Sequence, residues 1–257
     1  MYNVTMETEG HNIEFISAQF VAKFDSEDKI RRRLNEIEDK FSEHYGAPQT
    51  IPLPDDFTPD APRIILTSKN NHSQIVFSQM SVGLNVNFDN EYINNYGKTK
   101  EYINDRIATI EELLKSISID TFMFCGLSYN FRIKHGENTP KDFVAGYIKY
   151  NAVHEKEELF DASWQRSMVY DHEFFVNERM DVQRSYEGQN TQLPDLLKLS
   201  NKNMDGDGVV VSIDINNRFS YMADGEKRKT EDLKSAATFI YSLMEQKIQK
   251  WSGNSND

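Results

Sequence analysis

The segment FMFCGLSYNFRI, residues 122–133, begins with apolar residues on both sides and then alternates apolar with polar residues. Leu127, Tyr129, Phe131 and Ile133 fall on one side of an extended chain, because successive side chains of a strand point to opposite faces. An apolar start of this kind is typical of a strand inside a sheet. The sequence therefore predicts a central strand here.

Further strands are expected from the same alternation. Ile64–Leu66 leads to a polar turn at 69–72 and a returning strand from Ile75 to Phe77. The alternation changes phase near Gln79-Met80, which indicates a bulge or bend. The remaining expected strands are Val82–Phe88, Phe143–Ala152, Met168–Val176, Val182–Tyr186, Val209–Ile215 and Arg218–Met222, the last two joined by a tight hairpin turn at Asn216-Asn217.

Three helices are predicted where apolar residues recur at spacings of three and four, over 30–45, 103–117 and 233–251. Asp25-Ser26 and Thr230 are suitable capping residues before the first and third helices. Each helix has one apolar and one charged face, so each should cover a sheet or another helix. The predicted fold class is α+β, with mostly antiparallel sheets covered by three amphipathic helices.

The order strand, strand, helix occurs twice, over Gln74–Ser116 and Val209–Trp251, with almost no residue identity between the two copies. We predict a single compact unit, 1–257, with two related lobes, 1–135 and 140–257. Five prolines fall between Pro48 and Pro62. Because proline fixes φ and lacks an N–H, this stretch is predicted to be an extended surface strap, with a peptide-like docking segment as the alternative.

The chain carries a net charge of −12 and one cysteine, Cys125. This charge disfavours nucleic acid as a partner, and the basic run Arg31-Arg32-Arg33 lies among acidic residues typical of a salt-bridged helix surface. No apolar run approaches the ~20 residues of a membrane span, and the polar N-terminus does not resemble a secretion signal. We expect no membrane association and a cytoplasmic location, since a lone cysteine excludes an internal disulfide.

The most suggestive local motif is Asn203-Met204-Asp205-Gly206-Asp207-Gly208. As a calcium loop it would place oxygen ligands at Asn203, Asp205 and Asp207, with Asp214 at the last ligand position. Two features oppose calcium: the last ligand is Asp rather than the longer Glu, and a strand follows where a helix is required. The alternative is a surface loop entering a hairpin. Otherwise no cofactor is predicted.

The remaining reactive residues form no recognised motif. The six histidines lack a His-x-x-x-His pair or zinc spacing with cysteine: His11, His44, His72, His135, His154 and His172. On a strand His172 would point away from Asp171 and Glu173, so we expect a packed or partly buried histidine, while a site joining His154, His172 and an acid stays open. Cys125 is expected to be a buried, inert thiol. Hydrolase, kinase and dinucleotide motifs are missing from the sequence.

Three stretches carry a resemblance: Ile13–Phe20, Ile75–Asn87 with the helix leading into Gly126–Ile133, and Val211–Ile215 with the last helix. Together they resemble a sporadically distributed family of uncharacterised prokaryotic proteins of similar length. In that family a strand of the type Gly-Leu-x-Tyr-x-Asn-x-Ile follows the middle helix. Here Asn130 comes one place early and Arg132 precedes Ile133. The resemblance implies no catalytic residue, but its patchy distribution is typical of mobile or defence-related loci.

The first functional hypothesis is a non-enzymatic, acidic protein-interaction component, an accessory, inhibitor or antitoxin-like protein of such a locus. The alternative is an enzyme or ligand binder with a cleft between the lobes, using Asp205, Asp207 and Asp214 with or without a metal. Nucleic-acid binding through Arg31, Arg32 and Arg33 is a third hypothesis. A protein partner is expected under the first of these.

Overall fold

The computed structural model describes residues 13–54, 56–89, 91–133, 139–148, 161–186 and 204–251. Its strands are β1 (Ile13–Lys23), β2 (Gln49–Thr50), β3 (Ile64–Thr67), β4 (Ser73–Phe77), β5 (Ser81–Asn87), β6 (Thr121–Phe122), β7 (Phe124–Ile133), β8 (Ser163–Tyr170), β9 (Phe174–Tyr186), β10 (Met204–Asn216) and β11 (Arg228–Lys229). Its helices are α1 (Leu34–Phe41), α2 (Tyr96–Ser116), α3 (Pro140–Ile148), α4 (Arg218–Asp224) and α5 (Leu233–Trp251), with 3-10 helices η1 (Ile30–Arg33) and η4 (Thr230–Asp232).

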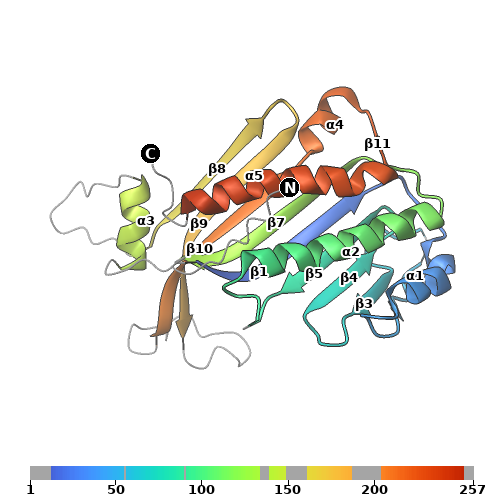
Figure 1. The fold of residues 1–257 in the computed structure, drawn as a ribbon, viewed down its shortest axis with the longest axis horizontal. Coiled ribbons are helices and arrows are strands. Elements are labelled where there is room, and N and C mark those ends of the chain that lie inside the picture. Colours follow the sequence, from blue (N-terminus) through green and yellow to red (C-terminus); the bar gives the residue numbers. More distant parts are fainter. Residues whose placement is uncertain are drawn as a thin grey trace.

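Nine strands form one antiparallel sheet in the order β2-β3-β4-β5-β1-β7-β10-β9-β8. The helices α2 and α5 lie side by side across one face of this sheet (Figure 1). Of the predicted central strand 122–133, residues 124–133 form β7, which pairs with β1 on one side and with β10 on the other, whereas Phe122 belongs to β6. The strands β6 and β11 form a separate two-stranded ribbon.

The strand order is symmetric about the pair β1 and β7. On one side follow β5, β4 and β3, and on the other β10, β9 and β8, with a long helix after β5 and another after β10. The predicted repetition of strand, strand and helix holds for Gln74–Ser116, which contains β4, β5 and α2, but not for Val209–Trp251, where α4 replaces the second strand. The two predicted lobes, 1–135 and 140–257, are not confirmed, because strands from both ranges join in one continuous sheet.

The face of the sheet under α2 and α5 is apolar, and the opposite face is polar. One buried aromatic group at the centre joins β1, α2, β7 and α5: Phe15, Tyr96, Tyr129 and Tyr241. Burying one such ring stabilises the fold by about 1.5–3 kcal/mol. On the opposite face, one register row is polar across eight strands: Thr67, Gln74, Asn85, Gln19, Ser128, Asp214, Asn177 and Ser167.

Five α-helices occur in the described ranges, rather than the three predicted. The predicted helices correspond to α1, α2 and α5, although the first begins with η1 at Ile30 and ends at Phe41. Asn95 caps α2 by accepting a hydrogen bond from the backbone N–H of Lys98. Thr230 does not act as the predicted side-chain cap, because its hydroxyl donates to the carbonyl of Ile119.

The predicted strand Phe143–Ala152 is wrong, since Pro140–Ile148 forms α3. The Thr139 hydroxyl donates a hydrogen bond to the Asp142 carboxylate and accepts one from the Asp142 backbone N–H. Pro140 stands at the first helical position. This local capping chemistry outweighs the alternation that favoured a strand. Residues 149–152 lie outside the described ranges.

The predicted strand Arg218–Met222 is also wrong, because these residues begin α4. The buried Asn217 side chain accepts a hydrogen bond of 2.7 Å from the backbone N–H of Cys125, in line with the strand ladder. This contact ends β10, so Asn216-Asn217 leads into a helix instead of a hairpin. Gly225, with φ of 72°, ends α4 in the left-handed conformation.

Two further predicted features, one strand and one bend, coincide with turns in the structure. The range Met168–Val176 is divided between β8 and β9 by a turn at 171–173, where Asp171 and His172 have φ of 51° and 52°. Asp and His are among the residues that tolerate this conformation. The phase change near Gln79-Met80 is the turn between β4 and β5.

In its described residues, the proline-rich segment is a surface strap with only the two-residue β2 as regular structure, as its prolines predict. Arg63 is fully buried and holds this strap from within. Its guanidinium donates hydrogen bonds to the carbonyl oxygens of Phe57 at 3.0 Å and Ala61 at 3.2 Å. Arg31 also binds the strap, by donating hydrogen bonds to the carbonyl oxygens of Ile51 and Leu53.

Candidate functional site

The predicted calcium residues do not form a loop around one point. Asn203 lies outside the described residues, and the backbone of Asp205 and Asp207 belongs to β10. Asp207 and Asp214 are seven residues apart on this strand, which corresponds to about 23 Å. The Asp214 carboxylate instead accepts hydrogen bonds from Asn177 and Asn216, both 2.9 Å. Calcium binding here stays a prediction that this strand conformation does not favour.

Within the described ranges, no three His, Cys, Asp or Glu side chains form a group that could hold a metal ion. Three of the histidines lie outside those ranges: His11, His135 and His154. His44 is exposed. His172 is also exposed, in the turn between β8 and β9, so the expectation of a packed histidine is wrong.

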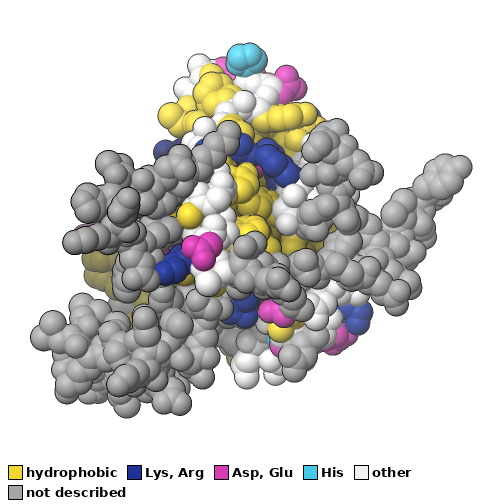
Figure 2. All heavy atoms as spheres, turned by 90° about the vertical axis from the view of Figure 1, so that its left-hand side faces the viewer, with side chains coloured by type: hydrophobic (Ala, Val, Ile, Leu, Met, Phe, Trp, Pro, Cys, Tyr) yellow, Lys and Arg dark blue, Asp and Glu magenta, His cyan; other side chains and the backbone are white. Residues whose placement is uncertain are grey.

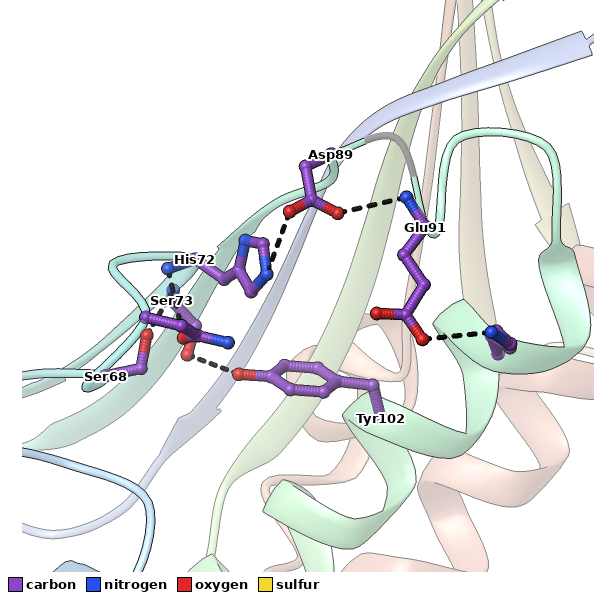
Figure 3. Close-up of polar contacts among 8 residues, drawn as sticks. Ser68, His72, Ser73, Asp89, Glu91 and Tyr102 are labelled. Atoms are coloured by element: carbon purple, nitrogen blue, oxygen red, sulfur yellow. Dashed lines mark hydrogen bonds and ion pairs between the residues drawn. The ribbon is translucent and has the colours of Figure 1, made fainter.

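His72 belongs to a polar network between the β3–β4 turn and α2 (Figure 3). Its Nε2 lies 3.1 Å from the Asp89 carboxylate. The neighbouring hydroxyl of Ser73 is 2.8 Å from the Tyr45 hydroxyl and 2.7 Å from that of Tyr102. Ser73 is therefore engaged by the two tyrosines, and its hydroxyl makes no hydrogen bond with His72.

The space beside His72 is also closed to a substrate. It is lined by His72, Phe88, Tyr92, Tyr102 and their neighbours, and it leaves no room for a water molecule. Burial raises the pKa of Tyr45 and of Tyr92, so both hydroxyls stay protonated near neutral pH. The network thus fixes the start of α2 to the β3–β4 hairpin.

Two other predicted features have structural roles. Cys125 is fully buried, and burial raises the pKa of its thiol to about 12, which agrees with an inert cysteine. Arg33 forms an ion pair with Glu36, as expected for a salt-bridged helix surface. The adjacent depression of about 580 Å³ is lined by acidic as well as basic side chains: Ser26, Glu27, Asp28, Lys29, Arg32 and Arg33.

Among the described residues, β8 is the last strand of the sheet on one side. It has eight residues, pairs with β9 without a register shift, and has no further strand beside it among the described strands. Figure 1 shows β8 at the margin of the sheet. The strand at the other end, β2, has only two residues. A long, regular edge presents a row of backbone N–H and C=O groups that another strand can pair with.

A buried charged cluster lies beside this edge, on the helix-covered face. The Glu178 side chain of β9 is fully buried, and its Oε2 accepts hydrogen bonds from Arg166 Nε at 2.9 Å and Nη2 at 2.7 Å. Its Oε1 lies 3.0 Å from Lys247 Nζ on α5. Two cations and one carboxylate leave this cluster with a charge of +1.

Aromatic rings enclose the cluster on one side. The Arg166 guanidinium lies over the Trp164 ring at 5.0 Å from its centre. Trp164 meets Tyr147 of α3 edge to face at 5.0 Å, and Tyr147 stacks on Trp251 of α5 at 4.9 Å. These contacts fix Trp164 and Arg166 in place, because neither side chain can rotate without breaking ring contacts.

Exposed apolar side chains mark the far end of β8. Val169 is 45% exposed, Tyr170 43% and Phe239 of α5 41%, and the Tyr170 and Phe239 rings are neighbours at 6.4 Å. Figure 2 shows hydrophobic side chains gathered at the top of this face, where the tip of the β8–β9 hairpin and α4 lie in Figure 1. Tyr170 and Phe239 thus form an exposed apolar pair on the helix-covered side, while Val169 points to the polar face, and exposed apolar residues that lie together are typical of a protein-binding surface.

Comparison with protein-family models and with curated proteins gave no match. The resemblance to a family of uncharacterised prokaryotic proteins therefore stays a prediction. None of the helices described in this structure is long and apolar enough to cross a membrane. The geometry of β8 and its surroundings is thus the basis on which a function can be proposed.

Proposed function

We propose that the protein is a non-enzymatic interaction component that binds an extended segment of a partner protein along β8. One observation carries this proposal: an eight-residue strand without a bulge ends the sheet beside exposed Val169, Tyr170 and Phe239. In this binding mode, called β-augmentation, backbone hydrogen bonds supply affinity and alternate side chains supply specificity.

The strand β8 lacks three of the devices that usually prevent strand addition, namely a proline, a bulge and a very short length. Soluble proteins protect edges with proline, bulges, charged residues or very short strands. The sequence of β8, SWQRSMVY, has no proline, and its single charged residue, Arg166, is bound to Glu178 on the helix-covered side. An eight-residue edge with no neighbouring strand among the described residues supports a role in binding.

A second copy of this chain fits the edge less well than a different protein. Antiparallel self-pairing places side chains of the same face opposite one another, so Arg166 would face Arg166 or Met168 of the copy in the two longest registers. Neither residue supplies a negative charge for the cluster. We therefore assign the edge to a partner of different sequence, which accords with an accessory, inhibitor or antitoxin-like role.

The experiment selects ligands from a displayed library of random octapeptides on the full chain. We expect binders that slow amide hydrogen exchange in 163–170. The double variant Val169→Asp/Tyr170→Asp should weaken them at least about tenfold, because both apolar contacts are lost. Phe57→Asp is the matched control, since Phe57 is 48% exposed and lies in the strap next to the opposite edge.

Three results would overturn the proposal. The first is a selection without binders, and the second is binders that leave exchange in 163–170 unchanged. The third is light scattering that shows a dimer of the chain alone, which the Val169→Asp/Tyr170→Asp variant dissociates. That dimer would mean that a second copy occupies the edge.

A further inference from the structure

The charge beside β8 also specifies the partner. We infer that the partner strand carries an acidic residue opposite Arg166, with apolar residues two positions before and after it. This inference rests on the proposed function, because it assumes that a strand pairs with β8. The inference adds a sequence pattern for the partner strand to the proposed function: apolar, any residue, Asp or Glu, any residue, apolar.

The alternation of β8 sets the spacing of this pattern. Trp164, Arg166, Met168 and Tyr170 point to the helix-covered side, and the residues between them point to the polar face. In an added antiparallel strand, directly opposed side chains lie about 4.5–5.5 Å apart on the same face. Partner residues on the helix-covered side therefore meet Trp164, Arg166 and Met168 in turn.

The acidic residue follows from the charge of the cluster. Glu178 neutralises only one of its two cations, and Arg166 makes its hydrogen bonds to Glu178 through Nε and Nη2. Within the described part of the chain, no hydrogen bond from Arg166 Nη1 is seen, so this group is left to donate to a partner carboxylate. A docked strand excludes water from Arg166, whose side chain is now 33% exposed. An uncompensated +1 charge would then disfavour binding, and a carboxylate removes this penalty.

The apolar flanks follow from Trp164 and Met168. Both side chains are partly buried and pack against the core, so each presents an apolar surface at the edge of the sheet. Trp164 is held by Tyr147 and Trp251 before any partner arrives. Such preorganisation reduces the entropy lost on binding.

The experiment uses the octapeptides that were selected on the full chain and that slow amide hydrogen exchange in 163–170. We expect Asp or Glu to be enriched at one position, with apolar residues two places on either side. Replacing this acid by its amide should weaken binding about tenfold to a hundredfold, as expected for a hydrogen bond between charged groups. The preference should disappear in Arg166→Gln and persist in Arg179→Gln, since Arg179 is 61% exposed and pairs with Asp181 on the opposite face.

The outcomes separate the two proposals. Peptides that protect 163–170 without any acid preference would overturn this inference and leave strand binding at β8 intact. A selection without binders would overturn both. The comparison of acid and amide peptides on the unmodified protein does not depend on the folding of Arg166→Gln. An acid preference that persists in Arg166→Gln would also contradict the inference, because another cation would be responsible.

Discussion

Replacing Glu178 with glutamine tests the charged cluster that stands behind β8. The substitution keeps the volume of the side chain and removes the single negative charge between Arg166 and Lys247. Removing one member of a buried ion pair destabilises a protein by about 3–5 kcal/mol. Here the cations are 33% and 24% exposed, so water recovers part of the loss. We expect a decrease in the free energy of unfolding of about 2–3 kcal/mol.

Thermal unfolding followed by circular dichroism at pH 7 measures this effect. At this chain length, 1 kcal/mol corresponds to about 2–4 °C, so Tm should fall by about 4–12 °C. The control Asp181→Asn removes one member of the exposed pair Arg179–Asp181 on the same strand and should change stability by no more than about 1 kcal/mol. Adding Arg166→Gln to Glu178→Gln should restore part of the stability, because it removes an unpaired cation. A Tm for Glu178→Gln equal to that of Asp181→Asn would refute the reasoning.

Three further predictions concern stability. Arg63→Met should lower the free energy of unfolding by about 2–3 kcal/mol and speed proteolysis in the strap. The control Arg32→Met, at an exposed site, should change this free energy by no more than about 0.5 kcal/mol, and equal effects would contradict the role of Arg63. Gly126→Ala should lower the free energy of unfolding, measured by urea denaturation, by about 1–3 kcal/mol, because a Cβ there would lie 2.7 Å from Asn216 Cβ. Gly83→Ala, with 3.8 Å to its nearest neighbour, should leave this free energy nearly unchanged. Burial raises the pKa of four tyrosines, so they stay protonated in the folded state above pH 10: Tyr45, Tyr96, Tyr129 and Tyr241. As pH rises above 10, the free energy of unfolding should fall by on the order of 1.4 kcal/mol per pH unit for each of them. An absorbance titration should show these phenolates only on unfolding, and their appearance in the folded protein near pH 10 would argue against burial.

The elements with strong local signals could be predicted from the sequence. The alternation after Gly126 and the apolar stripes of the two long helices directly report which side of each element is buried. The errors fall where a capping side chain decides the conformation. Thr139-Pro140-Lys141-Asp142 has the pattern of a helix start, and this signal could have identified α3.

The candidate site could not be predicted in the same way. Whether β8 is an edge depends on the order of nine strands, which alternation does not specify. Glu178 and Lys247 come together only because α5 crosses the sheet over β9, and they are 69 positions apart in the chain. The turn at Asp171 and His172 was missed because it lies inside a run that reads as one strand.

The pairing of β1 with β7 has a consequence for synthesis of the protein on the ribosome. Ser17 and Asn130 bond to each other although 113 positions separate them in the chain. Once α2 has left the ribosome, the strand that pairs with one edge of β1, β5, has also emerged, whereas β7, which pairs with its other edge, has not. The first half of the chain therefore has an unpaired edge at β1 until β7, from the second half, pairs with it. The finished protein retains a second such edge at β8, where the chain supplies no tenth strand within the described residues.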